Sequence, residues 1–241
     1  MIEFKDVSFK YKDEEVLKSI NVKIEQGDSI ALIGANGSGK STFLKLLNGM
    51  IFPMSGSYYF NNIQISRSKL EDSSFSKKFH KKMGFVFQNS DAQLFCSNVY
   101  EEVAFGPRQM GMDEAEVERR VEDCLKLLNV KNLQDKEPYN ISGGEKKRVS
   151  IAAVLALNPE VLVLDEPMSG IDPKGKKFLN NLFIELNKAG KTIICSTHDF
   201  EYVKGLFKRV LVFSEDHHII RDDVYNKVIE DNDFLIKYNI K

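Results

Sequence analysis

The sequence predicts an α/β domain with a mainly parallel sheet. The run Val161–Leu164 has the uninterrupted apolar character of a parallel strand buried on both faces, and Thr192–Ser196 is predicted to be another buried strand. A third apolar run, Ser29–Ile33, leads into a glycine-rich segment and then into a helical apolar pattern from Phe43. The chain has 241 residues, so we expect one compact unit that carries an insertion.

The glycine-rich segment Gly34–Thr42 reads GANGSGKST and matches the pattern G-x-x-x-x-G-K-[ST]. Its glycines allow successive backbone N–H groups to reach phosphate oxygens, and the following helix directs its positive end at the same oxygens. In this interpretation Lys40 bridges the β- and γ-phosphates, and the Ser41 hydroxyl ligates Mg²⁺. The alternative is a glycine- and serine-rich turn that happens to contain a lysine. A chance match to the motif is expected in roughly 1% of chains of this length. The predicted nucleotide ligands are Asn36, Gly37, Ser38, Gly39, Lys40, Ser41 and Thr42.

Composition limits the classes of partner. Lys and Arg total 34 against 35 Asp and Glu, so nucleic acid is not an expected partner. Cys96, Cys124 and Cys195 are widely spaced and odd in number, which is typical of a reducing cytosol. The acidic N-terminus has no signal-peptide core, and no apolar run approaches the ~20 residues that cross a bilayer. We therefore expect any membrane role to depend on a partner.

The N-terminal region predicts a small antiparallel sheet. Residues Ile2–Lys12 and Val16–Ile24 alternate as two strands of a hairpin with its turn at Asp13–Glu15, and Gly56–Ile65 is predicted to be a further strand. Pattern alone favours Tyr11 as a filler of this sheet over an aromatic face for a purine.

The middle of the chain predicts helices and one strand. The polar segment Ser66–Lys82 is predicted to be a solvated loop or short helix, and Met83–Phe87 a strand. That strand ends at Gln88, which could reach a metal or an attacking water, or could be an ordinary polar residue at a strand end. Residues Asp113–Leu128 have an amphipathic helical pattern.

A second anion site is predicted where Ser142-Gly143-Gly144-Glu145 begins a helix that runs to about Leu157. Ser142 can cap this helix, and the glycines expose backbone N–H groups. The alternative is a routine serine-capped helix start.

Two carboxylates, Asp165 and Glu166, close the strand Val161–Leu164, where they are costly to place without use. Ligands of open α/β sheets lie at the carboxyl ends of strands. If this strand neighbours the one before the glycine-rich loop, Asp165 can hold hydrated Mg²⁺ and Glu166 can deprotonate the attacking water. His198, after the strand Thr192–Ser196, could contact the γ-phosphate or be purely structural.

The C-terminal part predicts a hairpin from Arg209–Phe213 and Ile219–Arg221, followed by a short helix at about Asp223–Ile229. His217 and His218 are predicted to be solvated turn residues rather than metal ligands.

Together, these motifs resemble the nucleotide-binding subunit of ABC transporters along nearly the whole chain. The resemblance implies a P-loop NTPase (RecA-like) core with a mainly parallel sheet, an N-terminal antiparallel β subdomain and an inserted α-helical subdomain. The implied single domain divides into residues 1–90 (β subdomain and first part of the core), 91–157 (helical subdomain), 158–215 (rest of the core) and 216–241 (C-terminal hairpin and helix).

The resemblance also implies roles for individual residues. Tyr11 stacks on adenine, Gln88 couples the Mg²⁺ site to a membrane partner, and Asp172 lies at a dimer seam. Glu145 stands where the wider family usually has Gln. Two ATP molecules are sandwiched between two subunits, each held by one chain's phosphate loop and by Ser142, Gly143, Gly144 and Glu145 of the other.

A narrower resemblance, carried by Gln88–Phe95 (QNSDAQLF) and Val103–Pro107 (VAFGP), is to the ATPases of energy-coupling factor importers for cobalt, nickel or vitamins. It implies a peripheral subunit on the cytoplasmic face of the cell membrane. Its partners would be an integral membrane transport component, a separate substrate-specificity component and a second ATPase subunit, identical or paralogous. The alternatives are a soluble ABC ATPase acting on ribosomes or DNA, and a non-hydrolysing nucleotide sensor.

Overall fold

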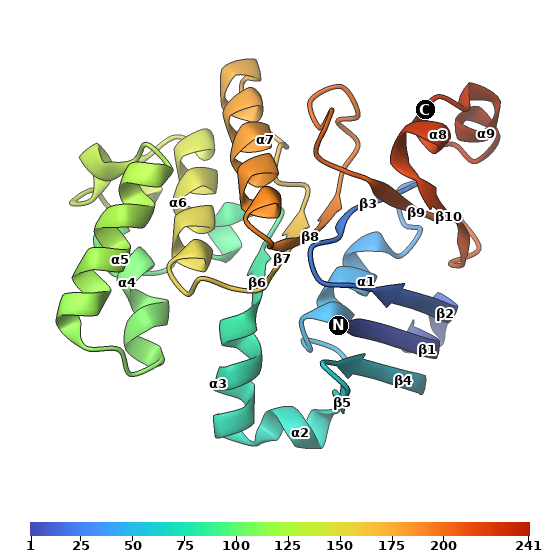
Figure 1. Cartoon of the computed structure of the whole chain (residues 1–241), viewed down its shortest axis with the longest axis horizontal. Helices are drawn as coiled ribbons and strands as arrows, with labels where there is room; N and C mark the ends of the chain where they lie inside the picture. Colours follow the sequence, from blue (N-terminus) through green and yellow to red (C-terminus); the bar gives the residue numbers. More distant parts are fainter.

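The computed structural model describes all residues from Met1 to Lys241 and contains two β-sheets surrounded by helices (Figure 1). The strands are β1 (Ile2–Tyr11), β2 (Glu14–Ile24), β3 (Ser29–Gly34), β4 (Ser55–Phe60), β5 (Ile63–Gln64), β6 (Met83–Val86), β7 (Val161–Asp165), β8 (Thr192–Ser196), β9 (Arg209–Phe213) and β10 (Ile219–Val224). The α-helices are α1 (Lys40–Leu47), α2 (Arg67–Glu71), α3 (Ser73–Lys82), α4 (Val99–Gln109), α5 (Glu114–Leu127), α6 (Gly143–Leu155), α7 (Pro173–Lys188), α8 (Tyr225–Ile229) and α9 (Asn232–Lys237).

The first sheet is antiparallel, with strand order β2-β1-β4-β5. The predicted hairpin of β1 and β2 is confirmed. The prediction of one strand over Gly56–Ile65 is wrong, because the chain reverses between β4 and β5. Asn61 and Asn62 make this turn with φ angles of 50° and 62°, in the left-handed region that asparagine tolerates.

The second sheet has the order β10-β9-β3-β8-β7-β6 and is parallel except for β10. Successive residues of its interior strands face opposite sides, since Ala31 and Ile33 belong to one apolar cluster while Ile30 and Leu32 belong to the other. The sheet is therefore buried on both faces, as the apolar runs predict.

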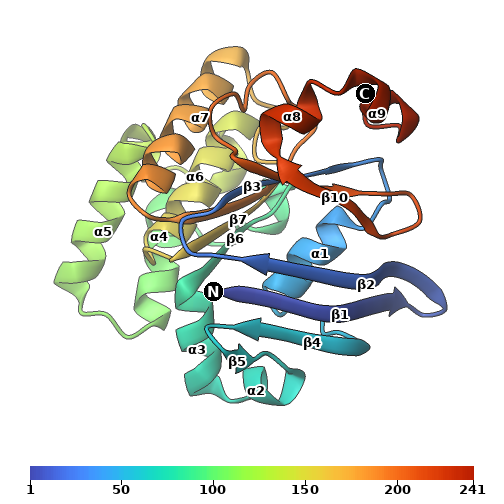
Figure 2. The same ribbon diagram turned by 45° about the vertical axis from the view of Figure 1, so that its right-hand side comes forward.

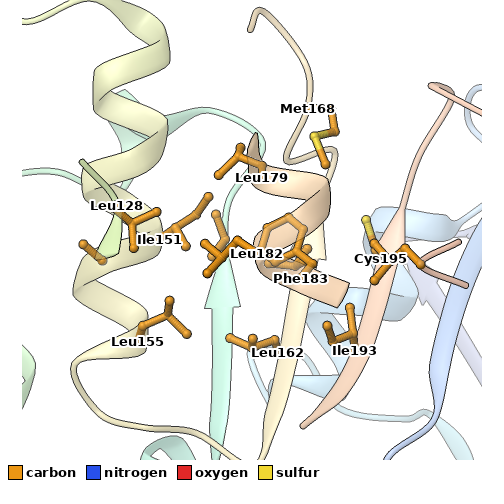
Figure 3. Close-up of a cluster of buried hydrophobic side chains, with 14 of the residues drawn as sticks. Leu128, Ile151, Leu155, Leu162, Met168, Leu179, Leu182, Phe183, Ile193 and Cys195 are labelled. Atoms are coloured by element: carbon orange, nitrogen blue, oxygen red, sulfur yellow. The ribbon is translucent and has the colours of Figure 1, made fainter. Parts of the chain in front are cut away.

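Helices α6 and α7 cover one face of the parallel sheet, and α1 and the antiparallel sheet lie on the other (Figure 2). Figure 3 shows how side chains from α6 and α7 meet those of the sheet, with Leu182 between Ile151 and Phe183, and with Leu162 and Ile193 of the sheet below them. Helices α4, α5 and α6 pack together beside the sheet. This packing determines where the first turn of α6 lies.

Three local differences from the sequence predictions have simple causes. Of the loop and the short helix that were both left open for residues 66–82, the structure has helix, and it has two of them, because Ser66 and Asp72 cap them and Phe79 is buried on one side. The last predicted helix begins at Tyr225 instead of Asp223, because residues up to Val224 pair with β9. The short helix α9 follows and was not predicted.

None of the helices combines the length and the apolar composition that are needed to traverse a bilayer.

Candidate active site at the phosphate loop

The loop between β3 and α1 adopts a conformation that only glycine can take at two of its positions. Gly34 has φ +148° and Gly39 has φ +105°. A Cβ atom at Gly34 would lie 2.3 Å from the carbonyl oxygen of Phe213, and one at Gly39 would lie 2.4 Å from that of Val16. Both the backbone angle and the lack of space therefore require glycine.

The N-terminus of α1 is left available for a ligand. Gly39 occupies its N-cap position and offers no side-chain hydrogen bond, whereas α4, α5, α6 and α7 each begin with a side-chain cap. Uncapped N–H groups at a helix start bind anions such as phosphate.

Lys40, the first residue of α1, is only 7% exposed. Its Nζ donates hydrogen bonds to the carbonyl oxygens of Gly34, at 2.7 Å, and Ala35, at 2.8 Å. Burial lowers the pKa of Lys40, whereas the negative charges of Glu166 and Asp165 act to raise it. The ammonium group is thus held at the loop by neutral acceptors.

Asp165 lies at the carboxyl end of β7 and is 7% exposed. Its Oδ1 accepts hydrogen bonds from the hydroxyl groups of Ser196, at 2.6 Å, and Ser41, at 3.2 Å. The prediction that Asp165 meets the phosphate loop is confirmed by its bond with Ser41. The prediction assumed that β7 neighbours β3, and this assumption is wrong, because β8 lies between the two strands. The α1 helix brings Ser41 across the intervening strand.

Ser196, the last residue of β8, is a site residue that the sequence analysis missed. Besides its bond to Asp165, its hydroxyl oxygen accepts a hydrogen bond from the backbone N–H of Glu166 at 3.0 Å. Ser196 therefore orients both acidic residues. The available signal was its position at the end of a buried strand, two residues before His198.

Glu166 and His198 face each other across the carboxyl ends of β7 and β8. The Nε2 atom of His198 lies 2.7 Å from Oε1 of Glu166. Glu166 has a φ angle of 47°, which is unusual for this residue type and is often found at functional sites. A carboxylate held beside an imidazole is suited to accept a proton from water.

A cavity of about 220 Å³ brings most of the predicted site residues together. It is lined by the loop residues Asn36 to Thr42, by Val16, and by Gln88, Glu166 and His198. Tyr11 does not line it: the residue is 43% exposed at the end of β1, and its ring forms a T-shaped pair with the Phe9 ring. The filler role that pattern alone favours for Tyr11 is therefore wrong.

The Ser-Gly-Gly helix start lies in a different place. Ser142, Gly143, Gly144 and Glu145 line a separate cavity of about 720 Å³ with residues that include Arg148 and Asp172. Asp172 caps α7 there by accepting a hydrogen bond from Gly175 N at 2.6 Å. The two cavities share no lining residue, so one chain does not bring its phosphate loop and its Ser-Gly-Gly turn to one ligand.

Ser142 and Glu145 form a capping box at the start of α6. Oε2 of Glu145 accepts hydrogen bonds from the backbone N–H of Ser142, at 2.8 Å, and from its hydroxyl group, at 2.7 Å. These bonds lower the pKa of Glu145 below its ordinary range.

Lys147 is a second residue that the sequence analysis missed. It lies on α6 and is only 3% exposed, and burial lowers its pKa to about 8 while Asp165 and Glu166 act to raise it. The signal was its spacing, since it precedes the buried Ser150 and Ile151 by three and four residues and so shares their helix face.

The residues at the phosphate loop fit a magnesium nucleotide. Mg²⁺ binds oxygen ligands and usually takes one or two carboxylates together with substrate phosphates. The Ser41 hydroxyl and the Asp165 carboxylate, 3.2 Å apart, are such a pair. No group of three or more His, Cys, Asp or Glu residues is placed to hold a metal ion by itself.

Comparison with known proteins agrees with this geometry. The family model described as ABC transporter matches residues 17–169. A Clostridium acetobutylicum protein whose name places it among ABC transporter ATP-binding proteins is 61% identical, over all of both chains. The nickel import ATP-binding protein LarO of Lactiplantibacillus plantarum is 45% identical over 92% of each chain. The energy-coupling factor transporter ATP-binding protein EcfA of Methanocaldococcus jannaschii is 40% identical, over all of this chain and 85% of its own.

Solved structures share the fold as well. CbiO1 from Clostridium perfringens, described as part of the ABC transporter complex cbiONQ, has 36% identity and a TM-score of 0.83, over 100% of this chain and 94% of its own. The cassette MJ0796, solved as a dimer in a post-hydrolysis state with ADP and Pi, has 29% identity and a TM-score of 0.83, over 93% and 98%. With a phosphate loop, an acidic strand end and these relatives, the chain belongs to the ABC transporter family, as an ATPase that uses ATP with Mg²⁺.

Proposed function

We propose that this chain is the ATP-hydrolysing subunit of an importer of the energy-coupling factor type, for a transition-metal ion such as cobalt or nickel, or for a vitamin. The names of LarO, a nickel import protein, and of EcfA support this class. The observation that carries the catalytic part is the pairing of Glu166 with His198 at 2.7 Å beside the phosphate loop.

In this proposal, different residues of one chain bind the phosphates, hold Mg²⁺ and activate the attacking water. The loop N–H groups and Lys40 bind the β- and γ-phosphates, and Ser41, Asp165 and Gln88 hold Mg²⁺, which supplies positive charge for the transferring phosphoryl group. Glu166 accepts the proton of the attacking water, and His198 orients Glu166 and contacts the γ-phosphate.

A second ATPase subunit completes the site in this proposal. Each ATP is held between one chain's phosphate loop and the partner's residues Ser142 to Glu145, with Tyr11 stacked on the adenine and Asp172 at the seam. The separation of the two cavities within one chain supports this arrangement, because a nucleotide held by both the phosphate loop and the Ser-Gly-Gly turn would have to take the two from different chains. MJ0796, which is solved as a dimer, also supports it.

The membrane partner is proposed to contact the segment after Gln88. Phe95 and Phe105 are 68% and 42% exposed, and their rings lie edge to face with centroids 5.0 Å apart. An exposed aromatic pair of this kind is suited to a protein interface. The chain would then lie peripherally on the cytoplasmic face of the membrane, together with a separate substrate-specificity component.

The catalytic part is tested by Glu166→Gln, which keeps the shape of the side chain and removes the proton acceptor. We expect ATP binding and ATP-dependent dimerisation to remain while kcat falls by about 10²–10⁴-fold. Phosphate release measured with ATP and Mg²⁺ checks this. A variant that hydrolyses ATP at the wild-type rate excludes Glu166 as the base.

The transport part is tested by identifying the proteins that co-purify with this chain from detergent extract of its own cells. We expect integral membrane proteins, and we expect Phe95→Ala combined with Phe105→Ala to reduce their recovery. Recovery of ribosomal proteins or DNA instead would support the alternative of a mechanical ATPase.

A further inference from the structure

The buried ammonium group of Lys147 connects helix α6 to the segment that follows β6. Its Nζ donates hydrogen bonds to the carbonyl oxygens of Phe87, at 2.9 Å, and Gln88, at 2.6 Å. Lys147 has no carboxylate partner among the ion pairs of the structure. A buried lysine is rare because removing its charge from water is costly, so two backbone acceptors at one peptide segment indicate a specific use.

The acceptors lie where β6 ends and the loop to Phe95 begins. The peptide groups of Phe87 and Gln88 set the direction in which the Gln88 side chain leaves the backbone. That side chain lines the phosphate-loop cavity, together with Glu166 and His198. A shift in these peptides would therefore move Gln88 relative to the phosphate loop.

Two further contacts tie the same segment to α6. Oε1 of Gln93 accepts a hydrogen bond from Phe87 N at 3.1 Å, and its Nε2 donates to the carbonyl oxygen of Ser150 at 3.1 Å. Lys146 forms an ion pair with Asp91 at 2.6 Å, but the Asp91 side chain is 68% exposed, and such pairs contribute little. Lys147 is thus the buried member of a set of contacts along one helix.

The other end of this connection is the start of α6. Lys147 lies in the second turn after Ser142, whose neighbours line the 720 Å³ cavity. An α-helix transmits a displacement of its first turn to residues one turn later, because its backbone hydrogen bonds make it stiff. The position of α6 and the position of Gln88 are therefore mechanically linked.

We propose that Lys147 is a positioning residue that fastens the peptide groups of Phe87 and Gln88 to α6, so that Gln88 takes its place at the phosphate loop according to where α6 lies. This inference rests on the proposed role of Gln88 as a Mg²⁺ ligand. It adds a link within one chain between the Ser-Gly-Gly turn and the phosphate-loop cavity.

The test is a double-mutant cycle with Lys147→Met and Gln88→Ala in the full chain. Outer residues that orient a metal ligand typically affect activity by about 10–100-fold, so we expect Lys147→Met to lower kcat by that factor and to raise the Mg²⁺ concentration for half-maximal rate. In the Gln88→Ala background the same substitution should change kcat by less than about 2-fold, because contacting residues are not additive. Binding of ATP measured without Mg²⁺ should stay unchanged.

Lys146→Met is the matched control, since it removes the adjacent lysine of α6 and only the exposed ion pair. We expect it to leave kcat and the Mg²⁺ dependence as in the wild type. Thermal unfolding checks that the variants are folded. If Lys147→Met unfolds, Lys147→Gln keeps an N–H donor and goes through the same cycle.

Equal losses of kcat in the wild-type and Gln88→Ala backgrounds would overturn the inference, because Lys147 would then act on packing in general. An unchanged Mg²⁺ dependence in Lys147→Met would also overturn it. Either result leaves the proposed function intact. A wild-type chain without Mg²⁺-dependent ATP hydrolysis would refute the proposed function itself, and the Lys147 inference would fall with it.

Discussion

At the scale of single residues, Tyr11 is more exposed than the alternating pattern of β1 predicts. Alternation along β1 favours a buried ring, yet Tyr11 is 43% exposed where it pairs with Glu14 at the end of the hairpin. The Tyr11 and Phe9 rings form a T-shaped pair with centroids 4.9 Å apart, and the exposure of Tyr11 leaves surface on which another ring can stack. Stacking of adenine on Tyr11 stays a prediction.

That prediction is tested by Tyr11→Ala. Loss of one base-stacking contact costs about 1–3 kcal/mol, so we expect the Kd for ATP to rise roughly 5- to 150-fold. Binding of inorganic tripolyphosphate should not change, because the phosphate loop is untouched. Titration calorimetry with both ligands checks this, and Tyr11→Phe is the control that keeps the ring. Equal weakening of both ligands would instead indicate damage to the loop.

At the scale of elements, the start of α6 contains a charge that stabilises the helix. The carboxylate of Glu145 accepts two hydrogen bonds from Ser142 at the positive end of the helix dipole. The pKa of Glu145 is therefore lower in the folded chain than in the unfolded one. Its contribution to stability is present above the unfolded pKa and is lost as the pH falls through the folded pKa.

Glu145→Gln should accordingly lower the free energy of unfolding at pH 7 by roughly 0.3–1 kcal/mol. The difference from the wild type should shrink as the pH falls below the ordinary carboxyl pKa of 4.5. Urea unfolding at a series of pH values measures this. Glu118→Gln, an exposed change on α5, should show no such difference. A Glu145→Gln difference that stays constant with pH would contradict the charge-based explanation.

The elements also show where sequence reasoning works and where it stops. The strands of the parallel sheet were predictable, because a strand buried on both faces is an apolar run. The helix α5 beside the sheet was predictable as well, because it has a clear amphipathic period. The turn at Asn61 was not predicted, and the choice between loop and short helix over residues 66–82 stayed open, since short polar segments depend on caps and on one or two buried rings. Lys147 was missed although its helical spacing to Ser150 and Ile151 placed it on the buried face, because a lysine on a helix is normally solvated.

At the scale of the whole molecule, the two cavities lie apart on one chain, and dimerisation would join them across two chains. Gly143 lines the larger cavity, and a Cβ atom there would have no neighbour within 4 Å. A side chain at this position is therefore compatible with the folded monomer, but in the proposed dimer it would project toward the partner subunit.

Gly143→Asp should fold with near wild-type stability, because an acidic residue suits the first turn of a helix. It should bind ATP at its own phosphate loop but lose ATP-dependent dimerisation and nearly all hydrolysis. Light scattering with the Glu166→Gln background, with and without ATP, distinguishes monomer from dimer. Ser74→Asp, which also adds an acidic residue at an exposed position in the first turn of a helix, α3, is the control away from both cavities. A dimer of Gly143→Asp that forms as readily as the control would show that the Ser-Gly-Gly turn faces no partner.

The sequence by itself determined the phosphate loop, since nine consecutive residues carry both the glycines and the lysine that the backbone conformation requires. It also determined that Asp165 and Glu166 end a buried strand. Only the tertiary structure decided that β8 lies between β3 and β7, that Ser196 orients both carboxylates, and that Lys147 reaches the peptides before and at Gln88. The physical reason is that strand order and buried side-chain contacts depend on how helices pack across the sheet. The sequence pattern indicates which segments form strands and helices, but it does not indicate how these elements pack against one another.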